Sequence, residues 1–171
     1  LRVYYTRNTY KLSNSNTAYG SITNSGSYAY GGYTVTSTAT NGIGCNFLGW
    51  FSENELISTE NTYTFTVDKN VVAKFEPKNE MSNFVFSSTV NSCTITGIND
   101  KTVTEIVVPD YVTEISKGAF SGCSKLESIT LPFVGGSKNA TSASSSTLFG
   151  YIFGSSSYTG GVSTQQYYSY S

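Results

Sequence analysis

Histidine is absent from the sequence, and charged residues are scarce. Only 12% of the 171 residues are Asp, Glu, Lys or Arg, and the net charge is −1, whereas globular proteins carry about 25% charged residues. The lack of His excludes metal sites built on imidazole and catalytic triads that use a His base. The lack of excess positive charge argues against a basic phosphate-binding face. We therefore expect no metal, no cofactor and no nucleic-acid partner.

Long apolar runs are also missing. No segment reaches the roughly 20 consecutive apolar residues that a membrane-spanning helix needs, so we expect no membrane insertion of this fragment. The sequence begins with Leu1 rather than Met. We interpret it as a piece of a longer protein, so the lack of an export signal says nothing about localisation.

Cysteine is rare, with only Cys45, Cys93 and Cys123 present. An odd number of thiols cannot all pair within the chain, and their spacing matches no zinc site. We interpret the three residues as small buried apolar side chains. A Cys93–Cys123 disulfide is the alternative.

The sequence does contain repeated alternation of hydroxyl-bearing residues with apolar ones. In residues 33–40 every second residue is Thr, which predicts a strand with its hydroxyl groups in water and Tyr33, Val35 and Ala39 facing inward. Residues 61–67 repeat this alternation. The residues expected to face inward there are Tyr63, Phe65 and Val67. Such patterns predict a mainly β protein with at most one or two short helical turns.

Changes of pattern along the chain predict four parts. Residues 1–16 are interpreted as the end of a preceding repeat unit, and residues 17–76 as a small β-sheet repeat domain. A polar, Pro-containing segment follows, and we expect a linker at residues 77–82. The remaining residues, 83–171, have a different repeat and carry a Ser/Gly-rich insertion.

A spacing of 23 residues relates two segments of this last part. Val103, Ile106, Val108 and Pro109 are matched by Leu126, Ile129, Leu131 and Pro132. Apolar repeats of 20–29 residues are typical of a leucine-rich-repeat β-solenoid, in which each turn buries the apolar strip of its neighbour. We expect a short strand at residues 112–115, a corner at 116–120 that buries Phe120, a strand at 148–153 and a further strand at 165–168.

Fewer than two full repeats are present, whereas solenoids usually need three or more. The repeat segment must therefore be supported by other parts of the chain. We expect the first domain to pack against Phe84–Phe86 or Cys93–Ile95, or the strand at residues 148–153 to cap the far end.

Two family resemblances follow from these segments. Residues 102–132 contain Ile-Val-Val-Pro, Val-Thr-Glu-Ile, Gly-Ala-Phe-Ser-Gly-Cys and Leu-Glu-Ser-Ile-Thr-Leu-Pro, and resemble the BspA-type leucine-rich repeat. The tail, with Leu-Phe-Gly-Tyr-Ile-Phe-Gly and Gln-Gln-Tyr-Tyr, resembles an insertion between such repeats. Residues 20–76 resemble the divergent InlB B-repeat through Tyr-Thr-Val-Thr, Phe-Leu-Gly-Trp-Phe, Tyr-Thr-Phe-Thr and Val-Val-Ala-Lys-Phe. Cys45 departs from that pattern.

These resemblances imply an extracellular protein on the surface of a Gram-positive, host-associated bacterium. They imply adhesion or scaffolding rather than catalysis, and they transfer no ligand-binding residue to this chain. The partners implied are host or matrix proteins or surface glycans. Two alternatives are a carbohydrate-binding accessory module of a larger surface enzyme and a purely structural spacer.

Few residues are candidates for chemistry. Glu53 and Glu55 are the nearest approach to a catalytic carboxylate pair, but a hairpin tip in solvent is the simpler interpretation. The segments Asp68–Asn70 and Asn99–Thr102 have oxygen ligands, yet too few carboxylates for a calcium loop, and we interpret them as Asx turns. The Gly-rich segment 42–47 lacks the Lys of a phosphate loop and is interpreted as a turn.

Aromatic residues are the remaining candidates for ligand binding. Trp50 lies in an apolar segment, so we expect a core residue rather than a sugar-stacking platform. Tyr28, Tyr30 and Tyr33 flank a Gly-Gly turn, and exposure there would favour a glycan platform.

Overall fold

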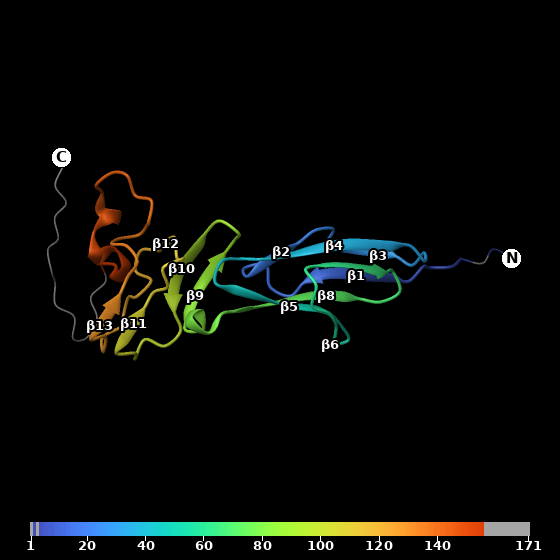
Figure 1. Cartoon of the computed structure of the whole chain (residues 1–171), viewed down its shortest axis with the longest axis horizontal. Coiled ribbons are helices and arrows are strands. Elements are labelled where there is room, and N and C mark those ends of the chain that lie inside the picture. Colours follow the sequence, from blue (N-terminus) through green and yellow to red (C-terminus); the bar gives the residue numbers. More distant parts are fainter. Residues whose placement is uncertain (1, 3, 156–171) are drawn as a thin grey trace.

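The computed structural model describes residues 2 and 4–155 and shows an elongated, mainly β molecule (Figure 1). Its described residues contain thirteen strands, three short 3-10 helices and no α-helix. Strands β1–β8 make up an N-terminal part at one end, and β9–β13 belong to a C-terminal part at the other. The strand expected at residues 165–168 lies outside the described residues.

The N-terminal part is a sandwich of two sheets. Its strands are β1 (Thr9–Asn14), β2 (Gly20–Ile22), β3 (Gly26–Ala29), β4 (Thr34–Asn41), β5 (Cys45–Ser52), β6 (Glu55–Ser58), β7 (Thr62–Thr66) and β8 (Val71–Pro77). One sheet has the order β3-β1-β8-β5-β6, and the other has the order β2-β4-β7. The apolar core includes Leu12, Trp50, Phe65, Val71 and Phe75, all buried. Large apolar side chains on alternate residues of both sheets therefore account for this sandwich.

The alternation of Thr with apolar residues produces the expected face of hydroxyl groups. In the antiparallel pair of β4 and β7, Thr36 lies opposite Thr64, and their hydroxyl oxygens are 2.7 Å apart. The inward side of this pair buries Ala39 and Phe65. The expectation that Tyr33 faces inward is wrong, because this residue precedes β4 and is 45% exposed.

β1 belongs to the sandwich rather than to a preceding unit. It lies between β3, to which it is antiparallel, and β8, to which it is parallel. Leu12 of β1 is buried in the core of the sandwich. The division expected between residues 16 and 17 therefore separates a strand from the sheet that contains it.

The C-terminal part consists of short strands, turns and 3-10 helices. Its elements are η1 (Asn79–Met81), β9 (Phe84–Ser88), β10 (Cys93–Ile98), β11 (Glu105–Val107), β12 (Glu114–Ile115), β13 (Ser128–Thr130), η2 (Ser145–Thr147) and η3 (Phe149–Phe153). β12, β10 and β9 form one sheet, while β11 and β13 form a second. The segment 77–82, expected as a linker, contains η1, and its Met81 is fully buried, so the segment is anchored to the core through this side chain.

The 23-residue spacing does bring equivalent residues together. β11 and β13 are parallel, and Ile106 pairs with Ile129. β10 and β12 are also parallel, with Ile95 opposite Ile115. These are two separate short pairs, so the described residues form no closed solenoid.

The segment 148–153 caps the C-terminal part, but not as the expected strand. It contains the 3-10 helix η3, which buries Ile152 completely. The backbone N–H of Phe120 donates to the carbonyl oxygen of Ile152 at 2.9 Å, and that of Gly118 donates to Tyr151 at 3.0 Å. Local apolar content predicted a strand, whereas hydrogen bonding to the 116–120 corner selects a tight helical turn.

Candidate interaction surfaces

The predicted site residues are mostly structural, and Trp50 is the clearest case. Its side chain is fully buried, and its indole N–H donates to the carbonyl oxygen of Glu60 at 2.9 Å. The ring packs against Phe47 and Tyr63, with centroid distances of 5.7 and 6.1 Å. The prediction of a core Trp is therefore confirmed, and no sugar can stack on this ring.

The three tyrosines near the Gly-Gly turn have different roles. Tyr28 is half-buried, its hydroxyl donates to the carbonyl oxygen of Asn24, and its ring contacts Phe65. Tyr30 and Tyr33 are 52% and 45% exposed. Only the last two present ring surface to a ligand.

The acidic candidates are all exposed: Glu53 and Asp68 lie in turns, Asp100 lies directly before a turn, and Glu55 begins β6. Glu53 and Asn54 have positive φ angles of 50° and 71° at the tip of the β5–β6 hairpin, as a two-residue type I′ turn requires. Asp100 accepts hydrogen bonds from the hydroxyl and backbone N–H of Thr102 at 2.7 and 2.8 Å, and these bonds lower the pKa of its carboxyl group. The described residues contain no cluster of potential metal ligands.

The three cysteines are buried free thiols, as the simpler interpretation predicted. Burial raises the pKa of all three, and that of Cys93 reaches about 11. Because the thiolate is the nucleophile, these residues are unreactive at neutral pH. They serve as packing residues in the core of the C-terminal part.

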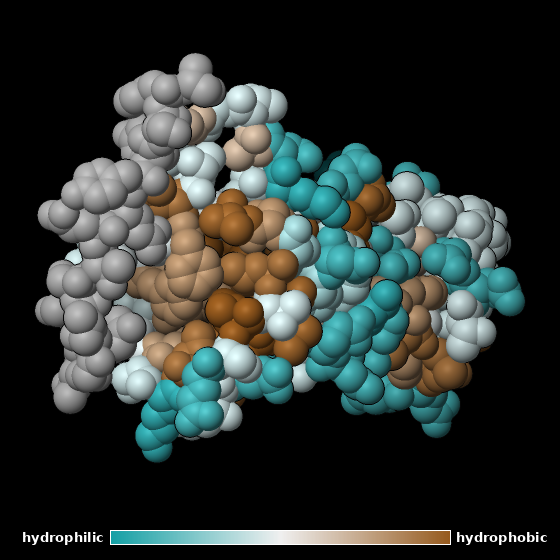
Figure 2. Space-filling view, turned by 60° about the vertical axis from the view of Figure 1, so that its left-hand side comes forward, coloured by the Kyte–Doolittle hydropathy of each residue, from teal (hydrophilic) through white to brown (hydrophobic). Residues whose placement is uncertain are grey.

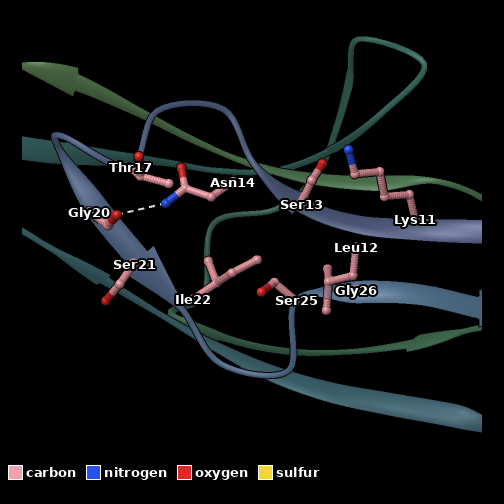
Figure 3. Close-up of a pocket in the computed structure, with 10 residues that line it drawn as sticks. All are labelled: Lys11, Leu12, Ser13, Asn14, Thr17, Gly20, Ser21, Ile22, Ser25 and Gly26. Carbon is pink, nitrogen blue, oxygen red and sulfur yellow. Dashed lines mark hydrogen bonds between the residues drawn. The ribbon is translucent and has the colours of Figure 1, made fainter.

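A hollow of about 440 Å³ opens between β1, β2 and the start of β3 (Figure 3). Leu12 and Ile22 supply apolar lining, and the other lining side chains are mostly Ser, Thr and Asn with a single charged one, Lys11. Asn14 closes one side by donating from its amide nitrogen to the carbonyl oxygen of Gly20 at 2.7 Å. No aromatic ring lines the hollow, so the hollow does not offer the stacking surface that a glycan site would use.

A joint connects the two parts, and the sequence analysis did not identify its residues. The backbone N–H of Ile43 donates to the carbonyl oxygen of Thr89, and that of Ser88 donates to Ala18, both at 2.9 Å. The hydroxyl of Ser88 also donates to the carbonyl oxygen of Ile43 at 2.6 Å. We call these contacts the joint. The expected packing of the first domain against β9 is thus present.

Aromatic side chains reinforce this joint. Tyr19 stacks on Phe86 with ring centroids 5.2 Å apart. Lys78, directly after β8, places its ammonium 5.4 Å from the centre of the Tyr111 ring. Within the C-terminal part, the hydroxyl of Tyr111 donates to Glu80 Oε1 at 3.0 Å. Burial and the Glu80 carboxylate raise the pKa of Tyr111, so its phenol stays protonated and able to donate.

Apolar surface gathers on the C-terminal part (Figure 2). In the first repeat, Ile106 and Val108 are only 2% and 3% exposed, and Ile106 pairs with Ile129 of the second repeat. The equivalent Ile129 and Leu131 are partly exposed. We define the apolar end surface as the four partly exposed residues Leu126, Ile129, Leu131 and Phe133.

Comparison with family models decides the nature of the N-terminal part, because residues 10–79 match the divergent InlB B-repeat domain. Residues 10–79 form such a domain. The matched range starts ten residues before residue 20, where the resemblance was expected to begin, and it includes all of β1 except Thr9. Domains of this family are typical of bacterial surface proteins. No helix among the described residues is long and apolar enough to cross a membrane.

Comparisons with curated proteins and with solved structures found no match. The match to the family model ends at residue 79 and does not reach residues 102–132, which resemble the BspA-type repeat. That resemblance stays a prediction.

Proposed function

We propose that this chain is a non-catalytic module of an extracellular bacterial surface protein, and that it acts in adhesion to host or matrix proteins. The InlB B-repeat domain supports the surface location. In this proposal, that domain is a spacer, and the C-terminal part is the element that contacts the partner.

The observation that carries this proposal is the apolar end surface. Contiguous exposed apolar residues on a soluble protein mark sites of interaction. Leu126, Ile129, Leu131 and Phe133 all pack on the C-terminal core while keeping part of their surface in solvent. The joint holds this surface in one orientation relative to the InlB B-repeat domain, which reduces the entropy lost on binding.

We also propose that the C-terminal part is a short leucine-rich repeat of the BspA type. The parallel pairing of Ile106 with Ile129, 23 residues apart, supports this proposal. Stacked repeats of this kind present a regular surface to protein partners.

A binding assay tests the adhesion proposal. The full chain, immobilised, is exposed to a panel of fibronectin, fibrinogen, collagen and laminin, together with the Leu131→Gln variant. The matched control is Leu56→Gln, since Leu56 is 53% exposed on β6 of the other part. We expect one panel member to bind the wild type and the control, and Leu131→Gln to weaken that binding at least tenfold. Absence of binding to every panel member would count against adhesion.

A second candidate function is glycan binding, and the exposure of Tyr30 and Tyr33 favours it. Tyr10 supports Tyr30 in an edge-to-face contact at 6.3 Å, and exposed aromatic rings with a fixed orientation suit sugar stacking. A glycan array comparing the wild type with the Tyr30→Ala/Tyr33→Ala variant tests it. Binding of the wild type to a glycan that is lost in the double variant supports this function. If the wild type binds no glycan on the array, glycan binding is rejected.

A further inference from the structure

The first and last strands of the InlB B-repeat domain are parallel neighbours. In the pairing of β1 with β8, Leu12 lies opposite Val71 and Asn14 lies opposite Ala73. β1 begins at the N-terminal end of the molecule, and β8 leads into the C-terminal part (Figure 1). Tension along the chain therefore enters this domain through one strand of the pair and leaves through the other.

Parallel strands pulled in this way are loaded in shear. The start of β1 is drawn one way along the strand axis and the end of β8 is drawn the opposite way, so the strands must slide past each other. The hydrogen bonds between the two strands then carry load together, because the evenly spaced, slanted bonds of a parallel pair all resist the same sliding motion. If both strands were pulled from the same end, the bonds would instead break one at a time.

The seam between β1 and β8 is lengthened at both ends, and its inner face is buried. The backbone N–H of Ser15 donates to the carbonyl oxygen of Ala73 at 2.9 Å beyond one end. Beyond the other end, the backbone N–H of Lys11 donates to Asn70 Oδ1 at 2.8 Å. On the inner face, Leu12, Val71 and Ala73 are each at most 1% exposed, whereas Ser13 and Val72 on the other face are half-buried. Exclusion of water from the inner face makes it harder to exchange the hydrogen bonds between the strands for bonds to solvent.

Both strands are also tied to the rest of the sheet. β8 is central and pairs on its other side with β5 from Cys45 to Phe51, while β1 pairs with β3. Beyond β8, the joint connects the domain to β9 by the hydrogen bonds of Ile43 and Ser88. A load leaving β8 thus meets a packed connection rather than a free linker.

We propose that the β1–β8 seam is a mechanical clamp that makes the InlB B-repeat domain resist tension applied along the chain. Its biological use rests on the proposed function at the cell surface, where an attached module is pulled. The resistance itself follows from the topology alone, so a failed binding assay would leave it intact.

Single-molecule force spectroscopy on the full chain tests the clamp with two attachment geometries. Handles at the exposed positions 8 and 76 load the seam in shear, because position 76 lies near the end of β8. Handles at positions 8 and 68 pull both strands from the same end, because position 68 precedes β8. The chain between the handles has a contour length of roughly 230 Å for 8–76 and roughly 200 Å for 8–68. The increase in length on opening, which is this contour length minus the folded separation of the handles, identifies the events. We expect a several-fold higher rupture force for 8–76 than for 8–68. Equal forces, or a lower force for 8–76, would overturn the clamp.

A matched pair of variants separates the clamp from overall stability. Asn70→Ala removes the acceptor that extends the seam, and Asn61→Ala removes a similar side-chain bond of 3.2 Å to Ala39 in the other sheet. We expect Asn70→Ala to lower the 8–76 rupture force and to leave the 8–68 force less affected, whereas Asn61→Ala changes the two forces in the same proportion. If Asn70→Ala, like Asn61→Ala, changed the 8–76 and 8–68 rupture forces in the same proportion, the seam would have no special role in resisting tension.

Discussion

Ser88 of β9 donates a hydrogen bond of 2.6 Å to the carbonyl oxygen of Ile43, 45 residues earlier in the chain. This bond crosses between the InlB B-repeat domain and the C-terminal part, and Ser88 is one of only two polar residues buried among the described residues. It therefore satisfies a carbonyl group that the joint removes from water.

Replacing Ser88 with Ala should lower the free energy of unfolding by about 1–3 kcal/mol, because the Ile43 carbonyl is left without this donor. Urea unfolding of the full chain, followed by Trp50 fluorescence, measures the effect. Ser87→Ala is the matched control, since Ser87 is exposed on the other face of β9. Its expected change is below about 0.5 kcal/mol. Equal effects of both changes would show that the joint does not depend on the bond.

Replacing Phe120 with Ala should lower the free energy of unfolding by about 3–5 kcal/mol, because the ring is fully buried and its loss leaves a cavity. Phe84 and Phe153 contact this ring, each with a centroid distance of 6.3 Å. Phe149→Ala serves as the comparison, since Phe149 is 40% exposed. Thermal and urea unfolding should give Phe120→Ala a much lower free energy of unfolding than Phe149→Ala. The reverse order would contradict the packing of this corner.

The two equivalent repeat positions should respond differently to truncation. Ile106→Ala should cost about 2–5 kcal/mol, as expected for a buried Ile, while Ile129→Ala should cost less because Ile129 is partly exposed. Urea unfolding of the two variants gives the difference directly. If Ile129→Ala lowered the free energy of unfolding as much as Ile106→Ala, Ile129 would have to be buried as fully as Ile106, which would contradict its partial exposure.

Stability should fall as the pH rises above about 9. The ordinary thiol pKa is 9.0, and burial, with a contribution from Cys45, raises the pKa of Cys93 to about 11. Between these values the unfolded chain loses the thiol proton while the folded chain keeps it, so the unfolded state binds fewer protons and is favoured. Below pH 9 both states are protonated and the full stability remains.

Urea unfolding at pH 7.5, 9 and 10 measures this dependence. A Cys93→Ala variant should show a shallower decrease than the wild type over the same range. If the free energy of unfolding of the variant fell with pH at the same slope as that of the wild type, groups other than Cys93 would cause the pH dependence. In the folded wild type at pH 7.5, a thiol reagent such as iodoacetamide should modify none of the three cysteines until urea is added.

Much of the local structure was predictable from the sequence. The Thr alternation in residues 33–40 and 61–67 predicted β4 and β7, because a strand places successive side chains on opposite faces. The 23-residue spacing predicted that Ile106 and Ile129 lie side by side. The apolar surroundings of Trp50 predicted its burial. In each case the pattern is short-range or strictly periodic, so the residues themselves carry the information.

Only the tertiary structure decided which distant segments meet. It placed β1 beside β8, joined Ser88 to Ile43, put Tyr33 outside the core and folded residues 149–153 into a 3-10 helix. The sequence pattern of one strand is compatible with many partner strands, because several of them could accept and donate the hydrogen bonds of its backbone equally well. The choice among partners depends on how the apolar faces of the whole chain are buried together, which is a property of the packed molecule and not of any one segment.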